Sequence, residues 1–202
     1  MGLTLGRRFA RLATDVTVRR PRLWPLFRPL IRWQFERLAP VWNQTISPEG
    51  DQLIAEALER VPAATQALDV GTGTGRGAEA LVSRFPEAQV TGVDVSPGMI
   101  EEARGRVPPA SFEVGDASHL PFGDGSFDLV THTNMIPFLD EVARVLRPGG
   151  WTVFAYTNGV DTPIYVRPEL LRQELDRRGF ADFADIAVGR GTAVLARRAG
   201  QD

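Results

Sequence analysis

Cysteine and lysine are both absent from the 202 residues of this chain, so all 23 basic residues are arginine. Without cysteine, disulfide bonds, thiolate metal ligands and a cysteine nucleophile are excluded. Long apolar runs are also missing, since no stretch approaches the roughly 18 residues that a membrane span needs. The first residues, interrupted by Arg7, Arg8 and Arg11, lack the apolar core of a signal peptide. We therefore expect a cytoplasmic protein, with a peripheral position on the inner face of the membrane as an alternative.

The residues that are present have the composition of a globular protein. The chain has 43% apolar residues, 24% charged residues and a formal net charge of -2, which indicates one domain with a small appendage. The charge is uneven, because residues 1–40 hold nine arginines against Asp15 and Glu36. This basic charge is spread over forty residues and no recognition motif accompanies it. No nucleic acid partner is therefore expected.

Residues 1–43 form a basic, aromatic segment that we distinguish from the main domain, residues 44–202. Three of the four tryptophans lie in it, and apolar residues recur at positions 24, 27, 31, 35, 38 and 42. This spacing predicts a helix, broken near Pro25 and Pro29, with one aromatic stripe. The stripe is interpreted as a cover that packs on the main domain. A helix that lies on an anionic membrane surface through residues 20–43 is the alternative.

From residue 44 onward, helix and strand patterns alternate. Ser47 and Pro48 predict the start of a helix that ends before Pro62. The later pattern predicts strands at 67–70, 89–95, 111–114, 127–132 and 151–157, helices at 78–85, 96–107, 138–146 and 168–179, and a terminal hairpin of 181–188 with 192–197. Such alternation is typical of right-handed crossovers and a parallel sheet. The predicted fold is α/β: a doubly wound, mostly parallel seven-stranded sheet with an antiparallel terminal strand.

Three loops after the first three predicted strands carry residues suited to binding a nucleoside. In the first loop, residues 69–77, glycines let the backbone turn sharply and approach a ligand at a helix N-terminus. Asp94 ends the second strand, where a carboxylate can accept both ribose hydroxyls. Asp116 follows the third strand, where a carboxylate can accept from an adenine amino group. The glycine spacing alone also fits dinucleotide-binding enzymes, so the first loop by itself leaves both classes open.

Four segments together resemble the successive motifs of class I S-adenosylmethionine-dependent methyltransferases: LDVGTGTGRGAEAL, VTGVDVSPGMIEEAR, VGDASHLPFGDGSFDLV and EVARVLRPGGWTVF. The resemblance covers about residues 47–198 and is closest to the ubiquinone and menaquinone methyltransferases. It implies that S-adenosylmethionine is the cofactor. It also implies that the first loop holds the amino acid end and sulfur, the acid after the second strand the ribose, and the residues after the third strand the adenine. The cofactor-binding residues implied in this way are Asp69, Gly71, Gly73, Gly75, Asp94, Val95, Met99, Asp116, Ala117 and Leu120.

The acceptor side of the predicted site departs from this family. The segment after the fourth strand is shorter than usual, and Trp42-Asn43 replaces the usual tyrosine and aspartate ahead of the glycine loop. His132, at the end of the fourth strand, is the candidate base because the pKa of imidazole lies near neutrality; a local hydrogen bond is the alternative role. Candidates for contact with the acceptor are Asn134, Tyr156 and Asn158. No histidine and carboxylate cluster has metal-ligand spacing, so no metal is expected.

The function predicted from the sequence is methyl transfer from S-adenosylmethionine to a small, apolar acceptor molecule. One alternative is a protein that binds S-adenosylmethionine and has a degenerate acceptor site. The other is a nicotinamide-dependent oxidoreductase with the same glycines, which would need a substrate domain that the residues after the fifth strand are too few to form. The acceptor, the methylated atom and the oligomeric state do not follow from the sequence.

Overall fold

The computed structural model describes the backbone of residues 2–38 and 48–200, and the side chains of residues 9–33 and 50–200. The Trp42-Asn43 pair and the predicted helix start at Ser47 lie outside the described residues.

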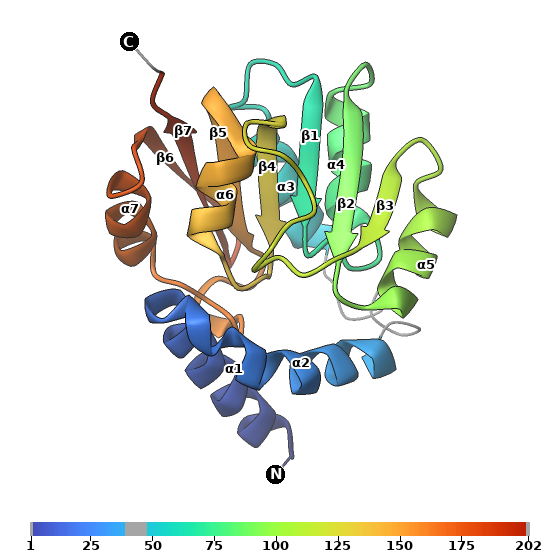
Figure 1. The fold of residues 1–202 in the computed structure, drawn as a ribbon, viewed down its shortest axis with the longest axis vertical. Coiled ribbons are helices and arrows are strands. Elements are labelled where there is room, and N and C mark those ends of the chain that lie inside the picture. Colours follow the sequence, from blue (N-terminus) through green and yellow to red (C-terminus); the bar gives the residue numbers. More distant parts are fainter. Residues whose placement is uncertain (1, 39–47, 201–202) are drawn as a thin grey trace.

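A seven-stranded sheet forms the centre of the molecule (Figure 1). Its order is β3-β2-β1-β4-β5-β7-β6. β7 pairs antiparallel with β5 and β6, and the other neighbouring strands pair in parallel. The strands are β1 (Gln66–Val70), β2 (Gln89–Asp94), β3 (Ser111–Val114), β4 (Phe127–Thr133), β5 (Leu146–Tyr156), β6 (Phe180–Val188) and β7 (Gly191–Arg198). The predicted doubly wound sheet with a reversed terminal strand is confirmed. Since β1 pairs with both β2 and β4, the strand order reverses beside β1, and ligands of such sheets bind at that switch point.

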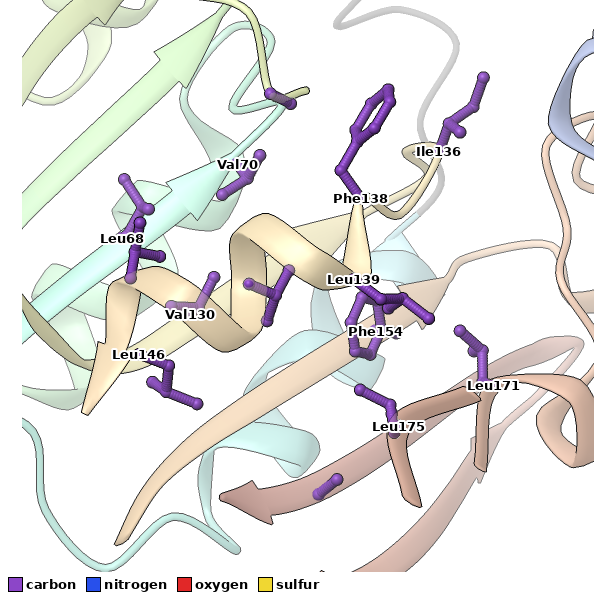
Figure 2. Close-up of a cluster of buried hydrophobic side chains, with 14 of the residues drawn as sticks. Leu68, Val70, Val130, Ile136, Phe138, Leu139, Leu146, Phe154, Leu171 and Leu175 are labelled. Carbon is purple, nitrogen blue, oxygen red and sulfur yellow. The ribbon is translucent and has the colours of Figure 1, made fainter. Parts of the chain in front are cut away.

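Helices cover both faces of the sheet because successive strand residues point to opposite sides. Leu68 and Val70 of β1 belong to one apolar cluster, whereas Ala67 of the same strand belongs to the other. Figure 2 shows the first cluster, in which strand residues meet Leu139, Leu171 and Leu175. The helices on that face are α6 (Leu139–Val145) and α7 (Pro168–Asp176); those on the other face are α3 (Pro48–Leu58), α4 (Arg76–Arg84) and α5 (Pro97–Arg106).

The N-terminal segment folds as α1 (Gly2–Arg19), a short 3-10 turn η1 (Pro21–Leu23) and α2 (Trp24–Leu38). In Figure 1, α2 runs across the end of the sheet at which β2 terminates. The predicted break near Pro25 and Pro29 is wrong, because α2 continues through both prolines. Pro25 occupies the first turn, where no N–H partner is needed, and the missing N–H of Pro29 costs only one early helical bond. No helix of the described residues is long and apolar enough to cross a membrane.

Side-chain contacts join this segment to the sheet domain. The Arg11 guanidinium donates to the carbonyl of Thr162, at a distance of 3.0 Å, and so ties α1 to the loop after β5. Trp24 is buried at 5% exposure and packs edge to face on Phe138, with ring centroids 5.2 Å apart. Phe27 and Ile31 are partly buried against the same cluster. The inner face of α2 thus lies on the core.

Candidate functional site

The loop from β1 to α4 has the backbone that its glycines predict. Gly71, Gly73 and Gly75 have φ values of +69°, +52° and +88°, a region that favours glycine over other residues. Gly75 is the N-cap of α4. The loop therefore brings main-chain N–H groups and the positive end of a helix to the switch point beside β1.

Asp94 connects this loop to the next one. Its Oδ2 accepts the N–H of Gly73 at 2.9 Å, and its Oδ1 accepts the N–H of Ser96 at 2.9 Å. Ser96 in turn caps α5, because its Oγ accepts the N–H of Met99. A carboxylate oxygen can accept more than one hydrogen bond, so these two contacts are compatible with ribose binding. Val95 is half-buried beside Asp94, and Met99 is 1% exposed.

Asp69 lies beneath the glycine loop, on the face of β1 that carries α4. The hydroxyls of Thr72 and Thr131 donate to its carboxylate at 2.7 and 2.9 Å. A Cβ on Gly77 would lie 2.5 Å from Oδ2, so only glycine fits there. Burial raises the pKa of Asp69 to about 6, and the hydrogen bonds of the two threonines oppose that rise. This carboxylate holds the loop in place, and a direct contact with the cofactor stays a prediction.

Asp116, after β3, is held by α2. Its Oδ1 accepts the indole N–H of Trp24 at 2.9 Å, and its Oδ2 accepts from the Arg28 guanidinium at 2.7 Å. Ser118 donates to Oδ1 through both its N–H and its hydroxyl. Burial alone would raise the pKa of Asp116, but the hydrogen bonds from Arg28, Ser118 and Trp24 hold it below its ordinary value. Two neighbours implied in adenine binding, Ala117 and Leu120, are buried.

The pKa of His132 differs from the value expected from the sequence. Its side chain is 2% exposed, and its ring stacks on Phe154 with centroids 4.6 Å apart. Burial lowers the pKa of His132 to about 3, so the expected value near neutrality is wrong. The imidazole is neutral at pH 7 and accepts a proton poorly.

The end of β4 supplies a residue that the sequence did not single out, Met135. A Cβ on Gly71 would lie 2.5 Å from its Cγ, so the Met135 side chain covers the first glycine of the loop. Asn134 precedes Met135 and has a φ of 51°. The nitrogen and the oxygen of its side-chain amide both form hydrogen bonds with Thr157. Its Nδ2 donates to the threonine Oγ1 at 2.8 Å, and its Oδ1 accepts the threonine N–H at 2.9 Å. Asn134 thereby joins the ends of β4 and β5.

Two other candidate acceptor contacts lie at the end of β5. Tyr156 is 2% exposed, and its ring meets that of Tyr165 edge to face at 5.2 Å. Burial raises the pKa of the Tyr156 hydroxyl. Asn158 is exposed in the loop that follows.

The structure therefore joins Gly73 and Asp94 directly, and it places Gly71 against Met135. It gives Asp116 partners from α2 that the sequence analysis missed, Trp24 and Arg28. The basic, aromatic character of residues 20–43 was the only signal in the sequence for that contact. Nothing in the sequence pointed to Met135 or Thr157.

Comparison with known proteins places this arrangement in a family. Residues 67–150 match the family model described as "Methyltransferase domain". Trans-aconitate 2-methyltransferase of Methylobacterium nodulans is 39% identical over 151 residues, which cover 69% of this chain and 56% of that protein. A ubiquinone/menaquinone biosynthesis C-methyltransferase of Desulfotalea psychrophila is 43% identical over 98 residues, 44% of this chain and 40% of that protein. The chain spans about half the length of the curated relatives that it matches.

Solved structures of methyltransferases share the fold of this chain. A S-adenosylmethionine-dependent methyltransferase from Aquifex aeolicus superposes with a TM-score of 0.65 at 19% identity, over 77% of this chain and 96% of that one. The matched residues 67–150 contain the glycine loop, Asp94 and Asp116. Residues 67–150 thus match a methyltransferase domain, and the chain has the Rossmann-like fold of S-adenosylmethionine-dependent methyltransferases, as its four motifs indicated.

Proposed function

We propose that this protein transfers a methyl group from S-adenosylmethionine to a small, apolar acceptor. The observation that carries the proposal is the bond from Gly73 to Asp94 at the switch point. It sets a carboxylate beside a run of main-chain N–H groups, and these are the two features that bind a nucleoside and its polar tail.

The residues present fit the cofactor. Asp94 would accept from the ribose hydroxyls, while Gly71, Gly73 and Gly75 would allow close approach of the amino acid end. Val95, Met99, Ala117 and Leu120 would border the adenine, and Asp116 would accept from its amino group. When bound, S-adenosylmethionine supplies an activated methyl group whose departure leaves a neutral thioether.

The acceptor would lie over the ends of β4 and β5. Half-buried Met135 provides apolar surface there, whereas Tyr156, at 2% exposure, lies in the core and offers the acceptor no surface. Asn134 fixes the two strand ends relative to each other through Thr157. His132 is too weak a base to be assigned proton removal, so we assign it to packing against Phe154. The residues of this site then act by aligning the acceptor and excluding water.

We also propose that residues 1–43 cover this site while residues 44–202 bind the cofactor. Support comes from Trp24 and Arg28, which α2 places on the Asp116 carboxylate. A protein lacking residues 1–43 should bind S-adenosylmethionine more weakly in calorimetry. Unaltered affinity in a truncated protein that unfolds cooperatively would refute the cover.

Calorimetry with S-adenosylmethionine and with NAD tests the cofactor assignment. The wild type should bind the first and not the second, and Gly73→Val should bind neither, because its side chain would occupy cofactor space and strain a position with φ of +52°. Circular dichroism would establish that the variant is folded. Preferential binding of NAD would favour an oxidoreductase.

A screen with radiolabelled methyl donor tests the acceptor. Apolar quinols and small carboxylic acids are the first acceptors to try, because relatives are named for ubiquinone, menaquinone and trans-aconitate. Transfer to an apolar acceptor supports the proposal. Tight cofactor binding with no transfer to any acceptor would favour a binding protein with a degenerate acceptor site.

A further inference from the structure

The helix α2 has two opposite apolar faces, and among the described residues it is the inner face that packs on the core. The inner face, with Trp24, Phe27 and Ile31, packs on the core. On the outer face, Leu26, Leu30 and Trp33 are 73%, 47% and 55% exposed. We call these three residues the outer stripe. Their spacing of four and then three residues aligns them along one side of the helix.

Positive charge surrounds the outer stripe. Arg19, Arg20, Arg22 and Arg32 are exposed, and the structure gives none of them an ion pair with a described acidic residue. Arg28 differs, because Asp116 neutralises it on the inner face. Over residues 1–40 the sequence has nine arginines and two acidic residues. A partner of this face must therefore accept leucine and tryptophan side chains and also carry negative charge.

We propose that the outer stripe docks α2 on the surface of an anionic phospholipid bilayer. A helix parallel to the membrane plane would insert Leu26 and Leu30 among the acyl chains and place Trp33 at the headgroup boundary. Arg22 and Arg32 would then meet lipid phosphates, to which a guanidinium binds with two parallel hydrogen bonds.

The two faces of α2 make this docking compatible with the folded site. The inner face keeps Asp116 bound through Trp24 and Arg28, while the outer stripe points away from the sheet. Figure 1 shows α2 across the end of the sheet where the glycine loop lies, so docking would turn that end toward the bilayer. The inference concerns binding to lipid, and its test does not require methyl transfer.

Co-sedimentation with vesicles tests the apolar part of the surface. Full-length protein should bind vesicles of equal parts phosphatidylglycerol and phosphatidylcholine, and bind vesicles of phosphatidylcholine alone far less. Leu26→Ser/Leu30→Ser should lower the partition coefficient by about tenfold or more, because two apolar side chains are removed from the acyl region. Leu26→Met/Leu30→Met keeps apolar side chains at both positions and should bind like the wild type. Equal binding of the serine and methionine variants would overturn the proposal.

A second pair of variants tests the charge. Arg22→Gln/Arg32→Gln should weaken binding at roughly 0.02 M salt and lose most of its difference from the wild type at roughly 0.5 M salt. The matched control Arg60→Gln/Arg177→Gln removes the same charge from exposed arginines near the amino-terminal ends of β1 and β6, and should bind normally. Equal losses in both pairs would indicate a net-charge effect and overturn the docking surface. A dimer in analytical ultracentrifugation that the serine variant dissociates, without vesicle binding by the wild type, would overturn it in favour of a second copy.

Discussion

Carboxylates stand at both ends of the central strands, and their partners differ. At the amino end, Asp128 is 5% exposed and accepts from the N–H and hydroxyl of Thr65, the N–H of Gln66 and the Arg147 guanidinium. At the carboxyl end, Asp94 is half-buried and accepts main-chain N–H groups of two loops. Asp116 takes its cation from α2, a separate element.

From this difference in partners we expect Asp128 to contribute to stability and Asp94 to contribute to cofactor binding. Asp128 is a buried carboxylate with donors on both oxygens, all from the sheet domain, so its removal would break several hydrogen bonds within that domain. Asp94 accepts main-chain N–H groups at the switch point, where we propose that it binds the ribose. A variant at one end should therefore leave the property that depends on the other end unchanged.

The largest effect is expected at the amino end. Asp128→Ala should lower the free energy of unfolding by about 3–5 kcal/mol, because it removes a buried carboxylate that accepts from four donors, one of them a guanidinium. Urea titration would measure it. The affinity for S-adenosylmethionine, measured in the fraction that stays folded, should not change. A large loss of affinity would contradict the expectation that Asp128 contributes to stability and not to cofactor binding.

At the carboxyl end, the expected pattern is the reverse. Asp94→Ala should weaken S-adenosylmethionine binding by roughly 2–3 kcal/mol, the scale of charge-assisted hydrogen bonds to a half-buried carboxylate. Calorimetry would measure the affinity, and urea titration should find a much smaller change in stability than for Asp128→Ala. Unchanged affinity in a folded protein would remove Asp94 from the site.

Asp69 extends the comparison, because it lies near the carboxyl end of β1 and yet holds the glycine loop in place through Thr72. Its pKa of about 6 lies above its ordinary value, so the folded state binds the proton more tightly than the unfolded state. The resulting stability is complete at low pH and is lost as the pH rises through about 6. Relative to the wild type, Asp69→Asn should therefore gain roughly 2 kcal/mol between about pH 4 and about pH 7. Denaturation curves for the two proteins at both pH values would measure this gain, and a difference independent of pH would contradict it.

The smallest effect concerns the ion pair between Arg28 and Asp116. Arg28 is half exposed, so a double-mutant cycle of Arg28→Gln with Asp116→Asn should give a coupling of about 0.5 kcal/mol. Since the pKa of Asp116 is lowered, this coupling should be present above the ordinary pKa of aspartate and fade as the pH falls through the lowered value. Arg32→Gln is the control, because Arg32 has no described acidic partner. Coupling of the same size for Arg32 would contradict the assigned contact.

The sheet could be predicted because local patterns determine it. Apolar runs entered glycine or proline at nearly every strand end, and the ends of β2 and β3 agree with the prediction to within one residue. The start of β5 was predicted five residues late, because Leu146 extends the strand through a pair with Phe127 across a register shift. Such pairing depends on a strand that lies elsewhere in the sequence.

Less of the candidate site could be predicted from the sequence. The glycines and Asp94 act through main-chain geometry at strand ends, which their spacing encodes. The contacts of Asp116 with Trp24 and Arg28 span 92 and 88 residues, and no periodicity reports a pair so far apart. The pKa of His132 depends on burial by neighbouring strands, so residue type alone gave the wrong value. The uninterrupted α2 shows that tertiary packing overrides a proline signal.

The position of α1 and α2 also sets an order of events during synthesis. Arg11 contacts Thr162, a residue 151 positions later in the chain, and Trp24 contacts Asp116. At ribosomal rates of roughly 5–20 residues per second, these partners emerge on the order of ten seconds after the first helix. During that interval both faces of α2 are available at once, to chaperones or to a lipid surface. Docking of the inner face must therefore be a late folding step, completed after the strands have assembled.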